Sequence, residues 1–571
     1  MAKIRHISIV NFRGIKRLEW CPNPGLNCII GPGDVGKSTI IDAIDLALGP
    51  RRTKLFSDAD FHMLDCENPI EILITIGCLA EQLQNFEKYD MFLRGYDATL
   101  GLIVDEPGGS LENVLTMRLS VAKDLDPIWG LYSERAEADG REKNITWGDR
   151  LLLAGTRIGS SSEHHLTWRK GAVLNRIGEE TPKSSSAIAE AKRAAMQAFG
   201  QESQPDLAET LSAVSKTASD LGVNLNGELQ ALLNAHSISL SGGTIAVHDG
   251  NGLPLSSLGL GSSRLLVAGL LDKAKMGSNI ILVDEIENGL EPHRIIRLLG
   301  AIGAKDPDEG KQSFITSHSP TALMELAAGQ LFRLSSDQVG SRLRKASVDD
   351  NSQGALRSAP ESFLARSVVI CEGASEIGFV RGLDQVFSIQ NISIFANGVS
   401  LLNAGGVSKL YKYAPTLLSL GLRAASFRDD DTEPDLASEQ IFIENSGTLF
   451  KWKPGQKLEA AIIHGLPDSA CLQLLEFGVE LMGEDTVRAH IQSVSQNQSS
   501  LDALRATALA QSLSFQERNW LVDACTTRNA WFKTIDRMER LAGTVVAPSY
   551  ANLLPDLKAV IDGLFQWAYQ N

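Results

Sequence analysis

Short apolar runs alternate with polar segments along much of the chain, and they predict alternating strands and helices. The β-branched run 4–10 predicts a strand, and the apolar run 25–30 predicts another. A Gly-rich segment then leads into an apolar stretch, 40–48, that predicts a helix. Farther along, a buried strand (279–283) is followed by a predicted helix (293–303). This alternation is typical of an α/β fold.

Two stretches break this pattern. Residues 181–235 are rich in Ala, Ser, Leu, Lys and Glu, and this composition predicts helices. Residues 347–360 are rich in Ser, Asp and Asn and predict a linker, after which the strand 367–371 opens a new unit. The mixed pattern of residues 100–165 does not predict particular helices or strands.

The Gly-rich segment GPGDVGKST matches the pattern GxxxxGK[ST] and lies between a predicted strand and a predicted helix. In such a loop the backbone N–H groups and the helix N-terminus bind phosphate oxygens. Lys37 is expected to reach the β- and γ-phosphates of a nucleotide, and the Ser38 hydroxyl to ligate Mg²⁺. The candidate nucleotide-binding residues here are Gly31, Gly33, Asp34, Gly36, Lys37, Ser38 and Thr39.

A second strand end carries the acidic residues that such a site needs. The apolar run 280–283 ends in Asp284 and Glu285. Asp284 is expected to hold the Mg²⁺ ion, and Glu285 to polarise the attacking water. His318 follows the next predicted strand, where it would sense the γ-phosphate.

The order of P-loop, long insertion, Gly/Ser-rich stretch, Asp-Glu and Ser-His-Ser-Pro resembles the ABC-type ATPase heads of the RecF, Rad50 and SMC group. In such heads ATP lies between two subunits, and the signature loop of one completes the site of the other. Two stretches compete for that signature. Residues 240–243 have the sequence Leu-Ser-Gly-Gly but lie within a predicted strand and hairpin. Residues 255–264 directly precede a predicted helix and are favoured. The particular serine stays open, and Ser262 is the candidate.

A separate acidic pattern follows the predicted linker. Glu372 lies at a strand end, and Glu376 falls in the first turn of the next predicted helix. A later strand ends in an acidic triplet, in which Asp429 and Asp431 point the same way if the strand pleat continues. Carboxylates at neighbouring strand ends suit Mg²⁺ or Mn²⁺. A solvated acidic turn is the alternative for the triplet.

The pattern EGxxE followed by DxD resembles a Toprim domain, a fold that serves topoisomerases, primases and nucleases. An ABC head followed by Toprim resembles the OLD (overcoming lysogenization defect) family, which includes the Gabija nuclease subunit. This resemblance implies a dimeric, metal-dependent DNA nuclease with an ATPase module and a two-metal mechanism. It implies Glu372, Asp429 and Asp431 as principal ligands with Glu376 assisting, Glu459 as a further ligand as in class 2-like members, and Lys533 as the cation facing the phosphate.

The expected fold class is therefore α/β, an ABC-type (RecF/SMC-like) ATPase head with a helical dimerisation insertion, followed by a C-terminal Toprim α/β domain. The expected division is 1–165 and 238–345 for the two parts of the head, 166–237 for the insertion, 346–362 for a linker and 363–571 for the Toprim domain.

The amino-acid composition bears on the cellular compartment and on the binding partners expected for the protein. The 571 residues carry a formal charge of −15, which argues at first sight against nucleic acid. Part of that charge, however, belongs to the two acidic sites, where divalent cations would offset it. The seven cysteines are scattered without a CxxC pair, as expected in a reducing cytosol. No signal peptide and no membrane span are expected, and the expected location is cytoplasmic.

The leading hypothesis is an ATP-binding, Mg²⁺- or Mn²⁺-dependent DNA endonuclease in anti-phage defence or mobile-element control. Its expected partners are phage or plasmid DNA, a second copy of the chain, and a helicase or other defence protein. One alternative is a RecF/SMC-like ATPase that clamps DNA without cutting it. Another is an ATP-sensing scaffold that controls a partner protein. A topoisomerase or primase is less favoured, since no companion nucleophile domain or zinc module is recognisable.

Overall fold

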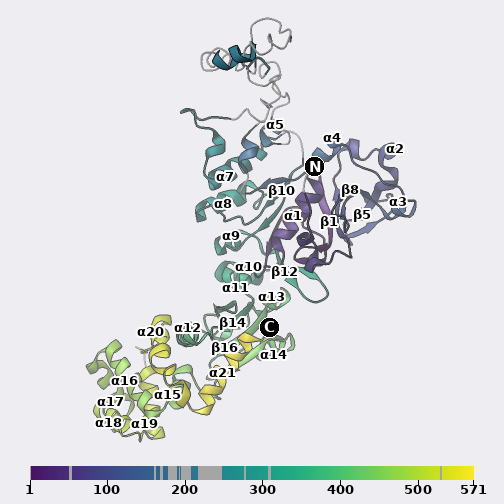
Figure 1. The fold of residues 1–571 in the computed structure, drawn as a ribbon. Coiled ribbons are helices and arrows are strands. Elements are labelled where there is room, and N and C mark those ends of the chain that lie inside the picture. The colour runs from purple at the N-terminus through teal and green to yellow at the C-terminus, as the bar shows by residue number, and fades with distance from the viewer. Residues whose placement is uncertain are drawn as a thin grey trace. The chain divides into compact units, whose positions relative to one another are not determined.

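The computed structural model describes two compact units of the chain (Figure 1). The first comprises Met1–Asn27 and Ser38–Thr316, and the second comprises Cys28–Lys37 and Ser317–Asn571. The described residues are 2–49, 55–159, 162–167, 172–177, 189–191, 193–194, 208–215, 247–274, 278–306, 310–526 and 530–570.

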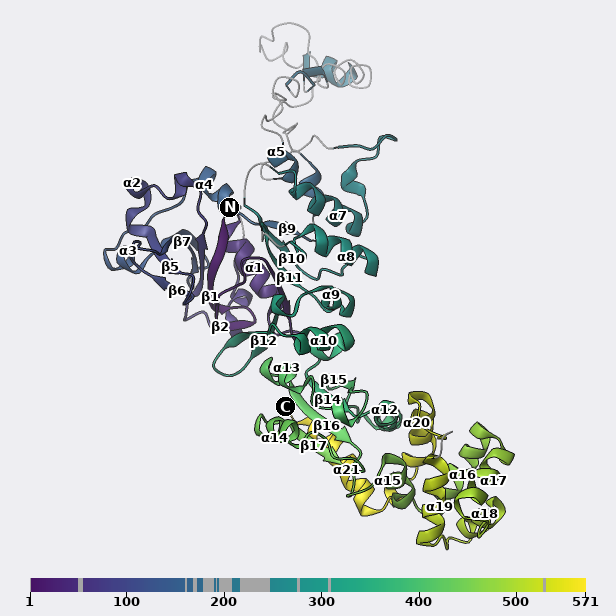
Figure 2. The same cartoon turned by 180° about the vertical axis from the view of Figure 1, so that it is seen from behind.

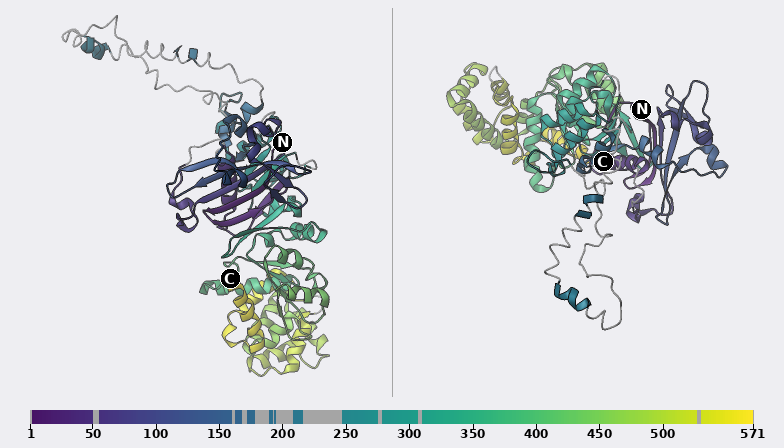
Figure 3. Two further views of the ribbon diagram at one scale, coloured as in Figure 1. Left: turned by 90° about the vertical axis from the view of Figure 1, so that its right-hand side faces the viewer. Right: turned by 90° about the horizontal axis from the view of Figure 1, so that it is seen from above.

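The first unit contains a largely antiparallel sheet built from the N-terminal third of the chain, seen in Figure 3. Its strands alternate buried and partly exposed residues, as in β4, where Ile70, Ile72 and Ile74 are fully buried. The strand order is β2-β1-β4-β7-β5-β6, with β8 also paired to β7. The strands are β1 (Lys3–Phe12), β2 (Ile15–Trp20), β4 (Ile70–Gly77), β5 (Leu93–Asp97), β6 (Leu102–Val104), β7 (Glu112–Val121) and β8 (Pro127–Tyr132).

The same unit contains a parallel ladder that carries the second nucleotide motif. Strand β10 (Ile280–Val283) pairs with β9 (Thr156–Ile158) on one side and with β11 (Gln312–Thr316) on the other. All four residues of β10 are buried, which explains its uninterrupted apolar sequence. The helices of this unit are α1 (Lys37–Leu48), α2 (Phe86–Tyr89), α3 (Glu134–Ala138), α4 (Trp147–Leu153), α5 (Val173–Ile177), α7 (Leu260–Leu271) and α8 (Pro292–Ala301).

Strand β3 (Leu26–Ile30) begins in the first unit and ends in the second, where it leads into the Gly-rich loop. There it pairs in parallel with β12 (Leu331–Ser336), so that Ile30 lies opposite Arg333. Strand β12 pairs antiparallel with β13 (Ser341–Lys345). Helix α9 (Pro320–Glu325) precedes this hairpin.

The stretch predicted to be a linker is helical. It forms α10 (Asp350–Ser358) and α11 (Pro360–Leu364). The Asp349 side chain accepts a hydrogen bond from Ser352 N at the start of α10. The Ser352 hydroxyl is fully buried against Thr416 Oγ1, 2.9 Å away. The abundant Ser, Asp and Asn therefore serve a helix cap and a packed contact here.

The rest of the second unit is an all-parallel sheet with helices around it (Figure 2). Its strand order is β15-β14-β16-β17, and the central strand β14 is wholly buried. The strands are β14 (Ser367–Cys371), β15 (Val399–Asn403), β16 (Arg423–Arg428) and β17 (Thr448–Lys451). The helices are α12 (Ala374–Phe387), α13 (Ala414–Ser419), α14 (Leu436–Glu444), α15 (Leu458–Gly465), α16 (Asp468–Met482), α17 (Glu484–Val494), α18 (Leu501–Leu509), α19 (Phe515–Thr526), α20 (Ile535–Leu541) and α21 (Pro555–Tyr569).

Helices α16 to α19 gather into a helical part beside α15 in both Figure 1 and Figure 2. The core of this region includes the fully buried Trp531, whose Nε1 donates to His490 Nδ1 at 3.1 Å. No described helix is long and apolar enough to cross a membrane. Most of the predicted helical insertion, 166–237, and the competing signature at 240–243 lie outside the described residues.

Candidate functional site

The first candidate site begins where α1 follows the Gly-rich loop. Ser38 Oγ donates to Asp284 Oδ1 at 3.0 Å, and Thr316 Oγ1 donates to the same oxygen at 2.6 Å. Thr316 Oγ1 also accepts from Glu285 N at 2.7 Å. The structure thus brings together the hydroxyl and the carboxylate that the sequence assigns to one Mg²⁺ ion. Thr316, which ties both acidic residues to the end of β11, was not identified from the sequence.

The Gly-rich loop itself lies in the second unit. Gly31 and Gly36 have positive φ angles of 149° and 98°, and Asp34 adopts a left-handed conformation with φ 61°. Lys37 is 6% exposed, and its Nζ donates to Gly31 O at 3.1 Å and to Pro32 O at 2.7 Å. Lys37 is therefore bound to carbonyl oxygens of its own loop.

A buried arginine supports the turn after β10. Arg264 on α7 is 1% exposed. Its guanidinium donates to Asp284 O, to Glu285 O and to Asn288 O, at distances between 2.5 and 3.2 Å. Because Glu285 has a positive φ of 46°, this turn is not a low-energy conformation without support. Arg264 lies within the predicted signature stretch, yet the sequence assigned it no role.

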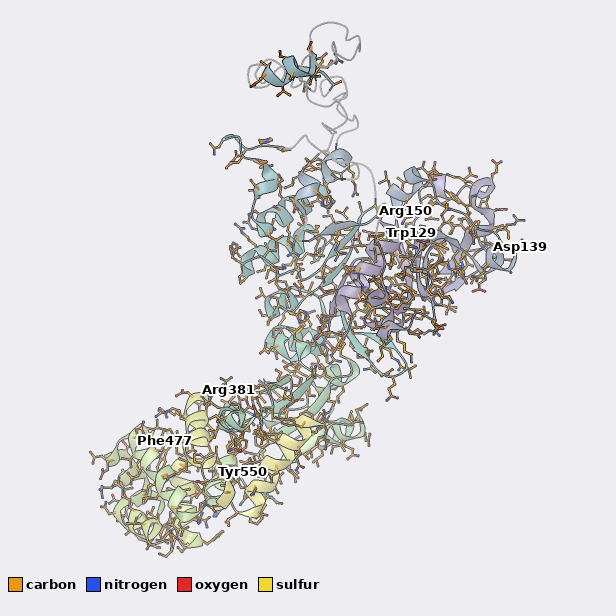
Figure 4. The ribbon with its side chains drawn as sticks, in the orientation of Figure 1. Trp129, Asp139, Arg150, Arg381, Phe477 and Tyr550 are labelled. Carbon is orange, nitrogen blue, oxygen red and sulfur yellow. The ribbon has the colours of Figure 1, made fainter. Side chains whose placement is uncertain are left out.

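The C-terminal end of α1 is held by residues from the stretch that sequence reasoning left unassigned. Arg150 Nε donates to Gly49 O at 2.8 Å, and its Nη2 donates to Ala47 O at 3.2 Å. Trp129 Nε1 donates to Leu46 O at 3.0 Å. The Arg150 guanidinium lies 5.6 Å from the Trp129 ring, and Figure 4 shows the two residues together. Carbonyls that a helix end leaves unpaired are thus satisfied here.

Three further predicted residues are exposed or partly exposed. Ser262 Oγ accepts from Arg294 Nη1 at 3.2 Å, near the start of α7. The Glu285 side chain is exposed. His318 is also exposed, two residues after Thr316 in the chain and just before the Ser319 cap of α9.

The second candidate site lies at the carboxyl-terminal edge of the parallel sheet. Strands β14 and β16 are direct neighbours and run in the same direction, so Glu372 and Asp429 follow them at the same edge. Asp429 N donates to Glu372 Oε2 at 3.1 Å. Gly406 N, in the loop after β15, donates to Glu372 O at 2.8 Å. Three strand ends are thus joined around Glu372.

Two helices start at this edge and each brings a buried carboxylate. Glu376 in the first turn of α12 and Glu459 in the first turn of α15 are each 4% exposed. Glu376 Oε2 accepts from Gly373 N at 2.8 Å, and Asp429 Oδ1 accepts from Leu458 N at 2.8 Å. Helix N-termini favour negative charge, which explains how these acids are tolerated in the interior.

The carboxylates repel one another. Burial raises the pKa of Asp429 to about 8, and the charges of Glu376, Glu372 and Glu459 add to that rise. Burial, with repulsion from Glu372 and Glu459, raises the pKa of Glu376 to about 7. Burial also raises the pKa of Glu372 and of Glu459. Such crowding of like charges marks a site that a cation would stabilise.

The acidic triplet is divided between two environments. Asp430 forms ion pairs with Arg428 at 2.8 Å and with Lys451 at 3.5 Å. Asp431 forms an ion pair with Lys457 at 3.3 Å and repels Glu372 and Glu459. Asp429 and Asp431 therefore share the carboxylate site, whereas Asp430 does not.

A close helix crossing brings Lys533 to the same site. A Cβ at Gly378 would lie 2.4 Å from Ile535 O, and one at Gly382 would lie 2.2 Å from Glu539 O, so α12 and α20 touch backbone to backbone. Arg381 on α12 also pairs with Glu539 at 2.7 Å. Lys533 precedes α20, and its charge lowers the pKa of Glu459 against the larger effect of burial.

The donor set fits a divalent cation, although within the described ranges no three His, Cys, Asp or Glu side chains are already drawn into metal-binding geometry. Carboxylate oxygens are the ligands that Mg²⁺ and Mn²⁺ prefer. Backbone N–H groups occupy one oxygen each of Glu372, Glu376 and Asp429. A cation bound by the remaining oxygens would offset the repulsion between these carboxylates.

Comparison with known families decides what this arrangement belongs to. Residues 26–325 match the family AAA_21, an AAA domain whose description also names the AbiEii toxin of a Type IV TA system. Residues 363–431 match the family described as Overcoming lysogenization defect protein-like, TOPRIM domain. The chain belongs to the OLD family. As in the sequence-based prediction, this OLD family chain combines an α/β ATPase head with a Toprim α/β domain, and that fold class is confirmed.

Solved structures similar to this OLD family chain include three heads of Smc proteins. One is a Smc head bound to the C-winged helix domain of ScpA, with 14% identity over 61% of this chain and 98% of that chain and a TM-score of 0.35. A Pyrococcus furiosus Smc head with an extended coiled coil, bound to the C-terminal domain of ScpA, has 14% identity over 61% and 97%, TM-score 0.33. The SMC head domain from Thermotoga maritima has 12% identity over 61% and 100%, TM-score 0.28. No curated protein sequence matches the chain.

Proposed function

We propose that the protein is an ATP-hydrolysing, divalent-metal-dependent DNA endonuclease. Its ATPase and Toprim domains imply an ATP-dependent nuclease. The observation that supports the finer statement is the convergence of buried, mutually repelling carboxylates at one sheet edge, on a chain that also carries a P-loop. A fold that merely presented a surface to DNA would gain nothing from burying four like charges together.

In this proposal Glu372, Glu376, Asp429, Asp431 and Glu459 hold the metal ions. Bound there, Mg²⁺ or Mn²⁺ would activate a water and stabilise the leaving oxygen of a phosphodiester. The N-termini of α12 and α15 orient Glu376 and Glu459. The exposed Lys533 faces the phosphate and offsets its charge.

In the same proposal, the ATP-binding site lies in the ATPase head. The backbone of Gly31, Gly33, Asp34 and Gly36 and the Lys37 ammonium bind the phosphates, with Thr39 closing the motif. Ser38 and Asp284 share a Mg²⁺ ion, and Glu285 polarises the attacking water. Further contributions come from His318 at the γ-phosphate and from Ser262 of a second copy of the chain.

Cleavage of supercoiled plasmid tests the nuclease. With Mg²⁺ or Mn²⁺ the protein is expected to nick or linearise the plasmid, and Asp429→Asn to lose this activity by at least ~100-fold. The matched control is Asp430→Asn, because Asp430 neighbours the site in sequence but faces Arg428 and Lys451. Equal loss in both variants would contradict the assignment. No cleavage of any DNA by the unaltered protein would favour a DNA-clamping ATPase or an ATP-sensing scaffold.

Two variants separate ATP binding from ATP hydrolysis. Lys37→Ala is expected to lose nucleotide binding. The Lys37 ammonium would leave the carbonyls of its own loop to contact the phosphates, and the variant lacks that cation. Glu285→Gln is expected to bind ATP and to hydrolyse it poorly. Unchanged turnover in Glu285→Gln would remove Glu285 from the proposed chemistry.

The biological setting is part of the same proposal. An OLD-like nuclease with these two sites would serve anti-phage defence or control of mobile elements, with phage or plasmid DNA as substrate. It would act in the cytoplasm as a homodimer or larger homo-oligomer, with a helicase or another defence protein as a partner. Plaque counts in cells that carry the wild-type protein or Asp429→Asn test this setting.

A further inference from the structure

A buried arginine in the second unit donates to three backbone carbonyls. Arg333 on β12 is 4% exposed. Its Nη1 donates to Leu420 O at 3.5 Å and to Gly421 O at 3.4 Å, and its Nη2 donates to Ala365 O at 3.4 Å. Within the described part of the chain no carboxylate forms an ion pair with it, and its buried Nε has no hydrogen-bond partner. A buried cation held only by long hydrogen bonds to carbonyls is costly, so these contacts are sensitive to small displacements of the strands that carry the carbonyls.

The three carbonyls lie at the amino-terminal starts of the two central Toprim strands. Ala365 lies two residues before β14, and Gly421 lies two residues before β16. These strands pair directly, and Glu372 and Asp429 follow their opposite ends. A single guanidinium therefore bridges the starts of the two strands that position the carboxylate site.

The backbone of β12 lies against the nucleotide loop. Arg333 is opposite Ile30, the residue just before the loop, in the β12–β3 ladder. A Cβ at Gly31 would lie 2.6 Å from Leu334 O, so the loop backbone touches the residue after Arg333. Lys37 is bound to Gly31 O and Pro32 O, and a nucleotide phosphate would draw Lys37 away from these carbonyls. A displacement of the Gly31 backbone would consequently displace the backbone of β12, which it contacts.

A second arginine makes this junction sensitive. Arg344 lies opposite Arg333 in the β12–β13 ladder, and burial, together with the charge of Arg344, lowers the pKa of Arg333 to about 10. The Arg344 side chain covers Gly421, where a Cβ would come within 1.6 Å of Arg344 Nη1. Gly421 has a positive φ of 74°, which also favours glycine. The positive charges of Arg333 and Arg344 thus lie at the same turn, at Gly421. A small displacement of β12 or β13 would change both the repulsion between these charges and the hydrogen bonds of Arg333 to the carbonyls.

We propose that Arg333 is a positioning residue that couples the nucleotide loop to the carboxylate site of the Toprim domain. The proposal rests on the proposed function, because the coupling acts on the metal site of the nuclease. Nucleotide binding moves Gly31 and β12, and Arg333 transmits that movement to the starts of β14 and β16. Arg333 touches neither substrate nor metal and acts only through these strands.

Hydrogen–deuterium exchange tests the coupling without requiring nuclease activity. In the full-length protein, a non-hydrolysable ATP analogue is expected to change exchange in the P-loop peptide and also in peptides that span 366–372 and 421–429. In Arg333→Met the P-loop response is expected to remain, whereas the response of the two Toprim peptides is expected to fall by at least ~5-fold. Arg342→Met is the matched control, because Arg342 is an exposed arginine on β13 and is expected to keep both responses.

Three outcomes overturn the proposal: Toprim peptides of the wild type that ignore the nucleotide, a full Toprim response in Arg333→Met, or an equal loss in Arg342→Met. Arg333→Lys keeps the positive charge and is expected to retain part of the response. If Arg333→Met does not fold, Arg333→Gln is measured in the same way and must lose the transmitted response. In plasmid cleavage, ATP is expected to change the rate for the wild type but not for Arg333→Met. A wild type that responds by exchange yet cuts no DNA would refute the proposed function and leave the coupling intact.

Discussion

Asp429 and Asp430 are adjacent in the chain but lie in different electrostatic environments. Asp430 is neutralised by Arg428 and Lys451, whereas Asp429 lies among Glu372, Glu376 and Glu459. The alternation of side chains along a strand end places them on opposite sides. The sequence motif DxD predicted this division, and the structure adds the reason, because Asp430 is paired with Arg428 and Lys451 while Asp429 faces other carboxylates.

Asp429→Asn is expected to stabilise the metal-free protein. Above pH 8, where Asp429 is ionised, the substitution removes one of four repelling charges, and the amide oxygen still accepts from Leu458 N. In EDTA the melting temperature is expected to rise by roughly 2–4 °C, and Mn²⁺ is expected to stabilise this variant less than the wild type. Asp430→Asn breaks ion pairs and is expected to lower the melting temperature. A lower melting temperature of Asp429→Asn in EDTA would show that repulsion does not dominate the site.

Arg264→Met is expected to impair ATP hydrolysis more than ATP binding. The variant leaves the carbonyls of Asp284, Glu285 and Asn288 without their buried donor, at a cost of about 1–3 kcal/mol. Because the turn that carries Glu285 loosens, the turnover number is expected to fall at least ~10-fold while ATP affinity changes little. Arg297→Met on the exposed face of α8 is the control. Comparable losses of affinity and turnover would argue against this role.

At the scale of elements, the contact between α12 and α20 depends on glycine. Gly382→Ala would place a methyl group 2.2 Å from Glu539 O, so α20 and the preceding Lys533 must move. The expected cost is about 1–3 kcal/mol, together with weaker plasmid cleavage, both measurable by thermal unfolding and nicking assays. Gly300→Ala on α8 is the control, because nothing lies within 4 Å of that position. There the substitution is expected to stabilise the helix by about 0.5–1 kcal/mol. A neutral Gly382→Ala would mean that the two helices do not touch this closely.

The elements that the sequence predicted best are the fully buried parallel strands. Strands β10 and β14 are short apolar runs that end in acids, and burial on both faces requires that composition. The linker was predicted wrongly in its local structure, because Ser and Asp serve helix caps as readily as loops. The mixed stretch from 100 to 165 carries β7, β8 and α4, whose boundaries depend on cross-strand pairing and not on local pattern.

At the scale of the whole molecule, the proposed ATP site is incomplete without a second copy of the chain. Lys37→Ala and Ser262→Arg are each expected to lack ATPase activity. A mixture of the two is expected to recover about a quarter of the wild-type rate, because half of the dimers contain one intact site out of two. ATPase assays on separate and mixed variants, with light scattering to confirm the dimer, measure this. Mixtures as inactive as the single variants would contradict a site shared between subunits.

The sequence by itself determined the family and the order of the two domains, and it predicted the acidic residues of the two sites, because motifs of this kind are local and need only a few residues at fixed spacing. It could not reveal Thr316, Arg264, Arg150 or Arg333. Each of these acts on backbone carbonyls or carboxylates that are distant in the chain, and any arginine or threonine looks alike in a sequence. Only the tertiary structure decided which side chains meet, since the close approach of buried charges and carbonyls exists only after the strands and helices have packed.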